Sequence, residues 1–258
     1  MTHTMANIQD KISTYPDFIE PFHVDFNNRV FPGVLCNDML NAAGKHSGQR
    51  GWGIPDLMKE QHTWVLSRFS VELNRIPQLG ETIDISTWVA GAIRLFTTRF
   101  FSLTLPDGTP LGYGRSIWAM INTQTRKPAD LLTFRGGELL NWIVSEEEKP
   151  CPISDMRTLR IRNATPARQV QTYYSDVDIN GHINSMKYVE HIVNLLNHEQ
   201  HTRGIRRLDI AYKSESYQGD VLSLCTEWEQ DDEVLLVDVK KPDGETAVQA
   251  RLTLFPRD

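Results

Sequence analysis

The sequence predicts an α+β fold in which two similar halves follow one another in a single chain, each a curved antiparallel sheet around one helix. Three observations predict this fold. Long segments in both halves alternate apolar and polar residues, which is the period of half-buried antiparallel strands. Each half has one helix candidate upstream of these segments. The strand segments also share an internal repeat.

The repeat is visible in landmarks that recur in the same order. Arg68 precedes Gly80 by the same spacing that separates Arg207 from Gly219, and an acidic residue follows each glycine. An alternating stretch that contains a tryptophan comes next in both halves. Each half then reaches a Pro-Asp-Gly turn flanked by segments that read as hairpin strands. The repeat therefore covers whole domains.

The two helix candidates differ in how regularly their apolar residues recur at helical spacing. The second ends near His198 and has the clearer apolar stripe, formed by Ile183, Met186, Val189, Val193 and Leu196. The first, roughly 37–50, has a weaker stripe and closes on a glycine cluster. Strand, helix and about four further strands in each half predict a tandem hot-dog fold. We place the domains at 1–134 and 158–258, joined by a linker with some helix at 135–157, where glycines, prolines and an acidic run break the periodicity.

Composition and charge exclude several classes of protein. Of 258 residues, 40% are apolar and 23% are charged, which predicts a soluble globular chain. No apolar stretch approaches the roughly 18 residues of a membrane span, and the first residues resemble neither a secretory signal nor a transit peptide, so the cytoplasm is expected. Three scattered cysteines predict neither a disulfide framework nor a cysteine zinc site. A net charge of −6 argues against nucleic acid as a partner.

The densest cluster of polar residues lies just before the second helix candidate. Asp178, Asn180 and His182 alternate, so in an extended stretch their side chains share one side. Gly181 permits close approach of a ligand. The N–H groups from Gly181 to Asn184, at the start of the helix, could stabilise an oxyanion. Asp and Asn before a helix are also common N-caps, so this segment alone leaves a structural role open.

The repeat supplies a second argument. When the halves are aligned on their repeated arginines, Ile76 and Pro77 lie opposite Glu215 and Ser216. The segment that we expect to lead into the first helix, 31–37, has no Asp, Asn, His cluster. A purely structural requirement would place similar residues in both halves. The asymmetry predicts one reaction centre in the second half and an apolar binding role for the first.

These residues resemble the plant-type acyl-acyl carrier protein (acyl-ACP) thioesterases, a family also found in bacteria. The family's run Asp-x-Asn-x-His-x-Asn-x-x-Lys-Tyr is matched by Asp178, Asn180, His182, Asn184, Lys187 and Tyr188. Its Tyr-x-x-Glu-Cys motif is matched at 212–216, except that Ser216 stands in place of the Cys. The resemblance spans roughly residues 20–255. It implies hydrolysis of fatty acyl-ACP, with release of the free fatty acid, termination of fatty-acid synthesis and acyl carrier protein as partner.

The missing Cys makes a cysteine nucleophile doubtful, so we expect attack by water. Asp178 and Glu215 would then act as the two carboxylates, one as base and the other orienting His182, with Asn180 holding water or substrate. Gly181, Asn184 and Ser216 are expected to support the site. Direct attack by Asp178, which would form an anhydride, remains an alternative. We expect no cofactor and no metal, because histidines near the end of the second helix are explained by the helix dipole.

Two other functions remain open at this point. One is an acyl-CoA thioesterase, and the other is a non-catalytic acyl-binding hot-dog protein, which the Asp, Asn, His and Glu set disfavours. We expect the acyl chain to lie against the first helix, and its candidate contacts are Ala42, Ala43, Gly44 and Trp52. The length and saturation of the acyl group, the choice of carrier and the formation of a homodimer are left open by the sequence.

Overall fold

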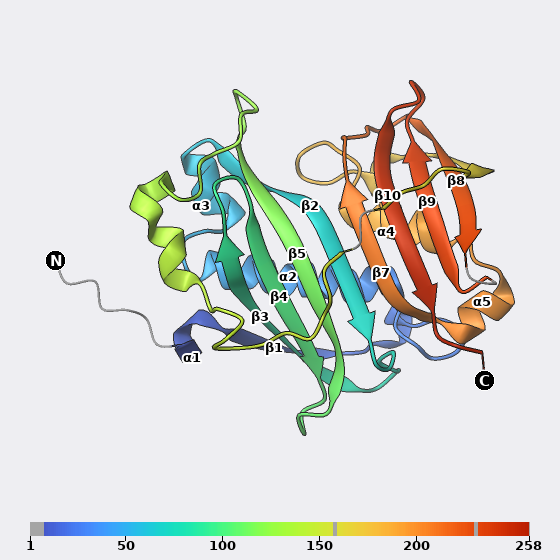
Figure 1. Cartoon of the computed structure of the whole chain (residues 1–258), viewed down its shortest axis with the longest axis horizontal. Coiled ribbons are helices and arrows are strands. Elements are labelled where there is room, and N and C mark those ends of the chain that lie inside the picture. The colour runs from blue at the N-terminus through green and yellow to red at the C-terminus, as the bar shows by residue number, and fades with distance from the viewer. Residues whose placement is uncertain (1–7, 157–158, 230–231, 258) are drawn as a thin grey trace.

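A computed structural model describes residues 8–156, 159–229 and 232–257, and its ten strands form one continuous antiparallel sheet (Figure 1). The first half contains β1 (Ser13–Phe18), α2 (Pro32–Gly48), β2 (His62–Leu73), β3 (Thr82–Ala92), β4 (Thr97–Thr104) and β5 (Pro110–Asn122). The second contains β6 (Thr165–Gln171), α4 (Ser185–Val193), β7 (Ile205–Tyr212), β8 (Val221–Glu229), β9 (Val234–Lys240) and β10 (Thr246–Leu254). The shorter helices are α1 (Ile8–Lys11), η1 (Pro21–His23), α3 (Ile54–Lys59), η2 (Phe134–Trp142), η3 (Tyr174–Asp176) and α5 (His198–Arg203).

The strand order is the same when it is followed inward from either edge of the sheet. It runs β1-β3-β4-β5-β2 in the first half and β6-β8-β9-β10-β7 in the second, and β2 pairs with β7 at the centre. In this pairing Ser70 lies opposite Asp209, which is its own equivalent in the repeat. A pseudo-twofold axis therefore passes between them, as at the centre of an isologous dimer. The predicted tandem hot-dog fold is confirmed.

Buried polar contacts join the two halves at this axis. Ser70 Oγ donates to Asp209 Oδ1 over 2.6 Å, and Arg207 donates to both oxygens of Asp209 at 2.8 Å. Arg207 also reaches Glu72 in the other half, at 2.7 Å. Because each buried charge has an opposite charge and hydrogen-bond partners, the cost of its desolvation is offset.

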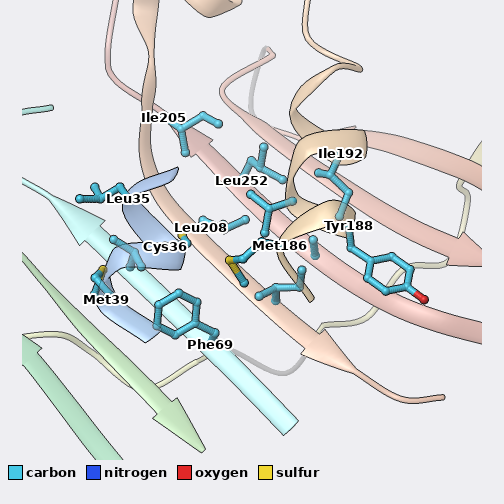
Figure 2. Close-up of a cluster of buried hydrophobic side chains, with 14 of the residues drawn as sticks. Leu35, Cys36, Met39, Phe69, Met186, Tyr188, Ile192, Ile205, Leu208 and Leu252 are labelled. Carbon is cyan, nitrogen blue, oxygen red and sulfur yellow. The ribbon is translucent and has the colours of Figure 1, made fainter. Parts of the chain in front are cut away.

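The two long helices pack side by side against one face of the sheet. Residues of α2 and α4 belong to a single hydrophobic core, and side chains of both helices meet the central strands (Figure 2). Among them, Met39 of α2 and Phe69 of β2 are fully buried. Gly114 of β5 allows α2 to approach closely, because a Cβ there would lie 2.2 Å from Met39 Cε. The sheet and helices thus place the start of each helix near the central strands.

The helix boundaries differ from those predicted. Helix α2 begins at Pro32 rather than near residue 37, because proline suits the first turn of a helix. Helix α4 ends at Val193, earlier than the predicted His198. The short helix α5 begins at His198, and the side chain of Asn197 caps it by accepting a hydrogen bond from the N–H of Gln200. The segment 31–37, which we expected to lead into the first helix, is largely part of that helix.

The segment predicted as a linker packs over the first half. Leu139 of η2 lies in a buried cluster with Trp52, and Val144 and Ile153 pack with Trp88. The predicted boundaries at 135 and 157 stay predictions. Within the described ranges, no helix combines the length and the apolar character that a membrane span requires.

Candidate active site

The loop 177–184, between η3 and α4, is shaped by the carboxylate of Asp178. Its Oδ1 accepts the backbone N–H groups of Asn180, at 2.8 Å, and His182, at 3.2 Å. The N–H of Asp178 donates in turn to the carbonyl of His182, at 2.8 Å. Gly181 has φ +81° and completes the turn. Asp178 Oδ2 has a single 3.4 Å contact with Asn180 Nδ2, so this oxygen remains available to a water molecule.

His182 and Glu215 face one another at the edge of this loop. His182 Nε2 lies 3.3 Å from Glu215 Oε2, and their side chains are 22% and 34% exposed. The ring of Tyr217 meets the His182 ring edge-on, with centroids 5.3 Å apart, and its hydroxyl lies 3.4 Å from Glu215 Oε2. The carboxylate of Glu215 is therefore placed to hold the imidazole in one orientation.

Arg126, which the sequence did not mark as a site residue, forms an ion pair with Glu215 Oε1. Arg126 belongs to the first half, in the turn after β5, and its φ of +59° is unusual for a residue other than glycine. Asn122 Oδ1 holds this turn by accepting from the backbone of Gln124 and Thr125. In the sequence an arginine in a polar turn looks like an ordinary solvated charge. No pattern in the sequence links it to Glu215, and only the structure shows their ion pair.

The predicted oxyanion donors are wrong. The N–H groups of Gly181, His182, Ile183 and Asn184 already donate, respectively, to Asp178 O, Asp178 Oδ1, Ser216 O and Asp176 O. Asn184 instead caps α4, because its Oδ1 accepts from Met186 N at 2.8 Å. In the part of the chain that the structure describes, the N–H of Ser185 has no acceptor. Ser185 is the first residue of α4, so this N–H also lies at the positive end of the helix dipole.

The first half contains a loop of the same geometry, which the sequence analysis did not recognise. Over residues 24–31, Asp25 Oδ1 accepts the N–H groups of Asn27, at 2.8 Å, and Arg29, at 3.0 Å. Asn28 has φ +59° at the place of the glycine in the second loop. An isolated bridge, Val24–Val30 here and Val177–Ile183 there, closes both loops.

Because loop 24–31 matches loop 177–184, the two halves differ less than the sequence predicted. The Asp-x-Asn pair occurs in both halves, so its loop-shaping role is structural and does not mark a reaction centre. The halves differ at the two residues that face one another in the second half, because His182 and Glu215 have Arg29 and Ile76 as counterparts. The expectation that the whole cluster is specific to the second half is therefore wrong for the Asp and the Asn, and it holds for the His and the Glu.

A cavity of about 150 Å³ lies between α2 and the first half's strands, lined chiefly by apolar and aromatic side chains. Three of the four predicted acyl contacts, Ala43, Gly44 and Trp52, line it. Ala42 does not, because it packs into the core with 2% exposure. Trp118 also lines the cavity and lies on β5, the strand that leads into the Arg126 turn. The described part of the chain holds no cluster of three or more potential metal ligands.

Two protein-family models match this chain. The model of the acyl-ACP thioesterase N-terminal domain matches residues 18–133, and that of the C-terminal domain matches residues 162–254. The chain belongs to the acyl-ACP thioesterase family. A crystal structure of an acyl-ACP thioesterase from Bacteroides thetaiotaomicron is 41% identical, covers 96% of this chain and 100% of its own, and superimposes with a TM-score of 0.90.

More distant members of the acyl-ACP thioesterase family come from plants. A chloroplastic acyl-(acyl-carrier-protein) hydrolase of Cuphea viscosissima is 26% identical over 85% of this chain, which spans 56% of that relative's length. A chloroplastic oleoyl-acyl carrier protein thioesterase of Coriandrum sativum is 22% identical over 93% of this chain and 69% of its own. The 12:0-ACP thioesterase from Umbellularia californica, at 20% identity, covers 96% of this chain and 98% of its own with a TM-score of 0.81 and so shares the fold.

Ser216, which stands where the plant-type acyl-ACP thioesterase motif has Cys, is 1% exposed. Its carbonyl accepts the N–H of Ile183 at 2.9 Å and so ties the candidate loop to the end of β7. The contact of Ser216 with this loop is made by its main chain, and its support of the site stays a prediction. Cys36 is also buried, and desolvation raises the pKa of its thiol to about 12. Neither residue offers an accessible nucleophile.

Proposed function

We propose that this chain hydrolyses the thioester of fatty acyl-ACP and releases the free fatty acid. The observation that carries the proposal is the pair His182–Glu215, which is specific to the second half and is completed by Arg126 from the first. The adjacent loop supplies a second carboxylate, and the first half supplies an apolar cavity beside the strand that carries the Arg126 turn. Membership of the acyl-ACP thioesterase family supports the same activity and acyl carrier protein as the partner.

In the proposed reaction, water attacks the carbonyl carbon of the thioester and Asp178 Oδ2 takes the proton of that water. The carbonyl oxygen becomes an oxyanion, and the free N–H of Ser185 at the start of α4 donates to it. When the carbon–sulfur bond breaks, His182, held by Glu215, protonates the departing thiolate. Asn180 holds the water through its side-chain amide. Glu215 thus orients the imidazole, and Asp178 serves as the base.

The carrier is tested by assaying one purified protein with the same acyl group on ACP and on CoA. We expect kcat/KM to be at least about tenfold higher for acyl-ACP, because contacts with the carrier protein add transition-state binding. Equal values for the two carriers would favour the acyl-CoA thioesterase. Binding of both without turnover would favour a non-catalytic acyl-binding protein.

The proposed acyl cavity is tested by placing larger side chains in its wall, which reduces its volume. A Cβ at Gly44 would meet nothing within 4 Å, so a valine there extends into open space beside α2. We expect Gly44→Val and Ala43→Val to shift the preferred acyl-ACP toward shorter chains, since overpacking costs about 1–3 kcal/mol and each buried methylene contributes about 0.8 kcal/mol. Activity on short chains should survive.

The matched control for these variants is Ala42→Val, on the same helix but outside the cavity wall. This change should lower the melting temperature and leave the preferred chain length unchanged. The measurement is the hydrolysis rate over acyl-ACPs of increasing length for all three variants. A fall that is uniform over all lengths for Gly44→Val and Ala43→Val would place the acyl chain elsewhere.

A further inference from the structure

A second cavity, of about 440 Å³, lies beside the loop 24–31 of the first half. Its size is within the usual range of small-molecule sites. Most of its wall is apolar and comes from both halves, including Val34 and Cys36 of α2, Val193 of α4 and Leu208 of β7. Arg29 is one of its lining residues. The catalytic proposal makes no use of this cavity.

The pseudo-twofold axis relates this cavity to the candidate active site. The loop 24–31 corresponds to 177–184, and the start of α2 corresponds to the start of α4. Arg29 and Ile76 also lie together, as His182 and Glu215 do. A Cβ on Gly204 would be 3.1 Å from Arg29 Nη1 and 2.6 Å from Ile76 Cδ1, so both side chains pack on this glycine.

The chemistry of the two sites differs at these two positions. Arginine stays protonated, and isoleucine carries no carboxylate, so the first-half site lacks the His–Glu pair that we propose protonates the departing thiolate. A permanent cation beside an apolar cavity instead matches a ligand with a carboxylate on a hydrocarbon chain. A fatty acid has this chemistry.

The charges around Arg29 support an anionic ligand. Arg29 Nη1 donates to the carbonyl of Thr202 at 2.6 Å, and within the described ranges no carboxylate lies at ion-pair distance from its guanidinium. The two acids at the cavity have other contacts. Asp25 accepts backbone N–H groups, and Glu190 pairs with Lys187 at 2.8 Å. The remaining guanidinium N–H groups are therefore available to a carboxylate.

We propose that this cavity is a non-catalytic site for a free fatty acid, with the carboxylate on Arg29 and the chain along the wall formed by α2, α4 and β7. The site is a second one, separate from the catalytic pair. Its ligand is of the same class as the product of the proposed hydrolysis, so the choice of a fatty acid as natural ligand rests on that function. The binding itself does not require hydrolysis.

The test is calorimetric titration of the full chain with dodecanoate and with dodecanol. We expect wild type to bind dodecanoate at a site that Arg29→Gln weakens by about tenfold or more, since a charged hydrogen bond is lost. Dodecanol should bind there weakly and equally to both proteins. Val193→Phe, which fills the cavity, should abolish the same binding, and Arg29→Lys should restore part of the affinity lost in Arg29→Gln.

Two controls separate this inference from the proposed function. Glu215→Gln should lose acyl-ACP hydrolysis and keep dodecanoate binding, and Arg29→Gln should keep hydrolysis. Dodecanoate binding that is unaffected by both Arg29→Gln and Val193→Phe, or no binding to wild type, would overturn the fatty-acid site. Normal hydrolysis in Glu215→Gln would overturn the proposed catalytic centre and leave the fatty-acid site standing.

Discussion

Asp178→Asn is expected to lower kcat on acyl-ACP by about 10²–10⁴-fold, the usual range for the loss of a general base. The amide oxygen of asparagine can still accept the N–H groups of Asn180 and His182, so the loop should keep its shape. The variant loses only the ionised Oδ2. A rate measurement on acyl-ACP, with the melting temperature as a check of folding, gives the result.

The matched control is Asp25→Asn in the equivalent loop of the first half. Asp25 accepts the same two kinds of backbone N–H group, and Arg29 and Ile76 stand where the second half has His182 and Glu215. This variant should change stability as much as Asp178→Asn does and leave turnover close to that of wild type. If both variants have nearly normal turnover, Asp178 acts only on the shape of its loop and His182 becomes the candidate base.

A single turnover in water labelled with ¹⁸O tests for an Asp178 anhydride that water opens at the Asp178 carbonyl. Attack by water places the label in the first molecule of fatty acid that is released. An anhydride opened at the Asp178 carbonyl would instead release an unlabelled first product and leave the label in the protein. We expect a labelled first product.

Glu215→Gln is expected to lower kcat by about 10²-fold or more. A neutral amide cannot stabilise the positive charge of the His182 imidazolium that donates the proton to the thiolate. The change keeps the size of the side chain. Because the pair with Arg126 is partly exposed, its loss should cost at most about 1 kcal/mol of folding stability. A loss of rate without a loss of melting temperature is the expected pattern.

Arg126 gives a control that acts through Glu215 alone. Arg126→Gln should lower kcat less than Glu215→Gln, and the double variant should have the rate of Glu215→Gln, because residues in one network are not additive. Effects that multiply in the double variant would contradict the proposed role of Arg126 and show that it acts on substrate directly.

The sequence by itself determined the architecture and predicted a candidate centre in the second half. The landmarks around Arg68 and Arg207 recur because each half has the same strands and turns, and they predicted equivalent strands. That these strands pair with one another, with Ser70 opposite Asp209, came from the structure. The alternating residues before α4 indicated the loop that holds His182. Both signals are local, since they depend on strand period, turn residues and spacing along the chain.

Only the tertiary structure revealed the loop around Asp25 as the equivalent of that around Asp178. Helix α2 is longer than α4, and α3 follows it before β2, so an alignment made on the strands misplaces the loops that precede the helices. The role of Arg126 and the free N–H of Ser185 were also hidden, because each depends on which groups the folded chain brings together. Hydrogen bonds and ion pairs between distant segments leave no periodic pattern, and for that reason the sequence indicated the candidate loop but not its contacts with the first half and with the segment after β7.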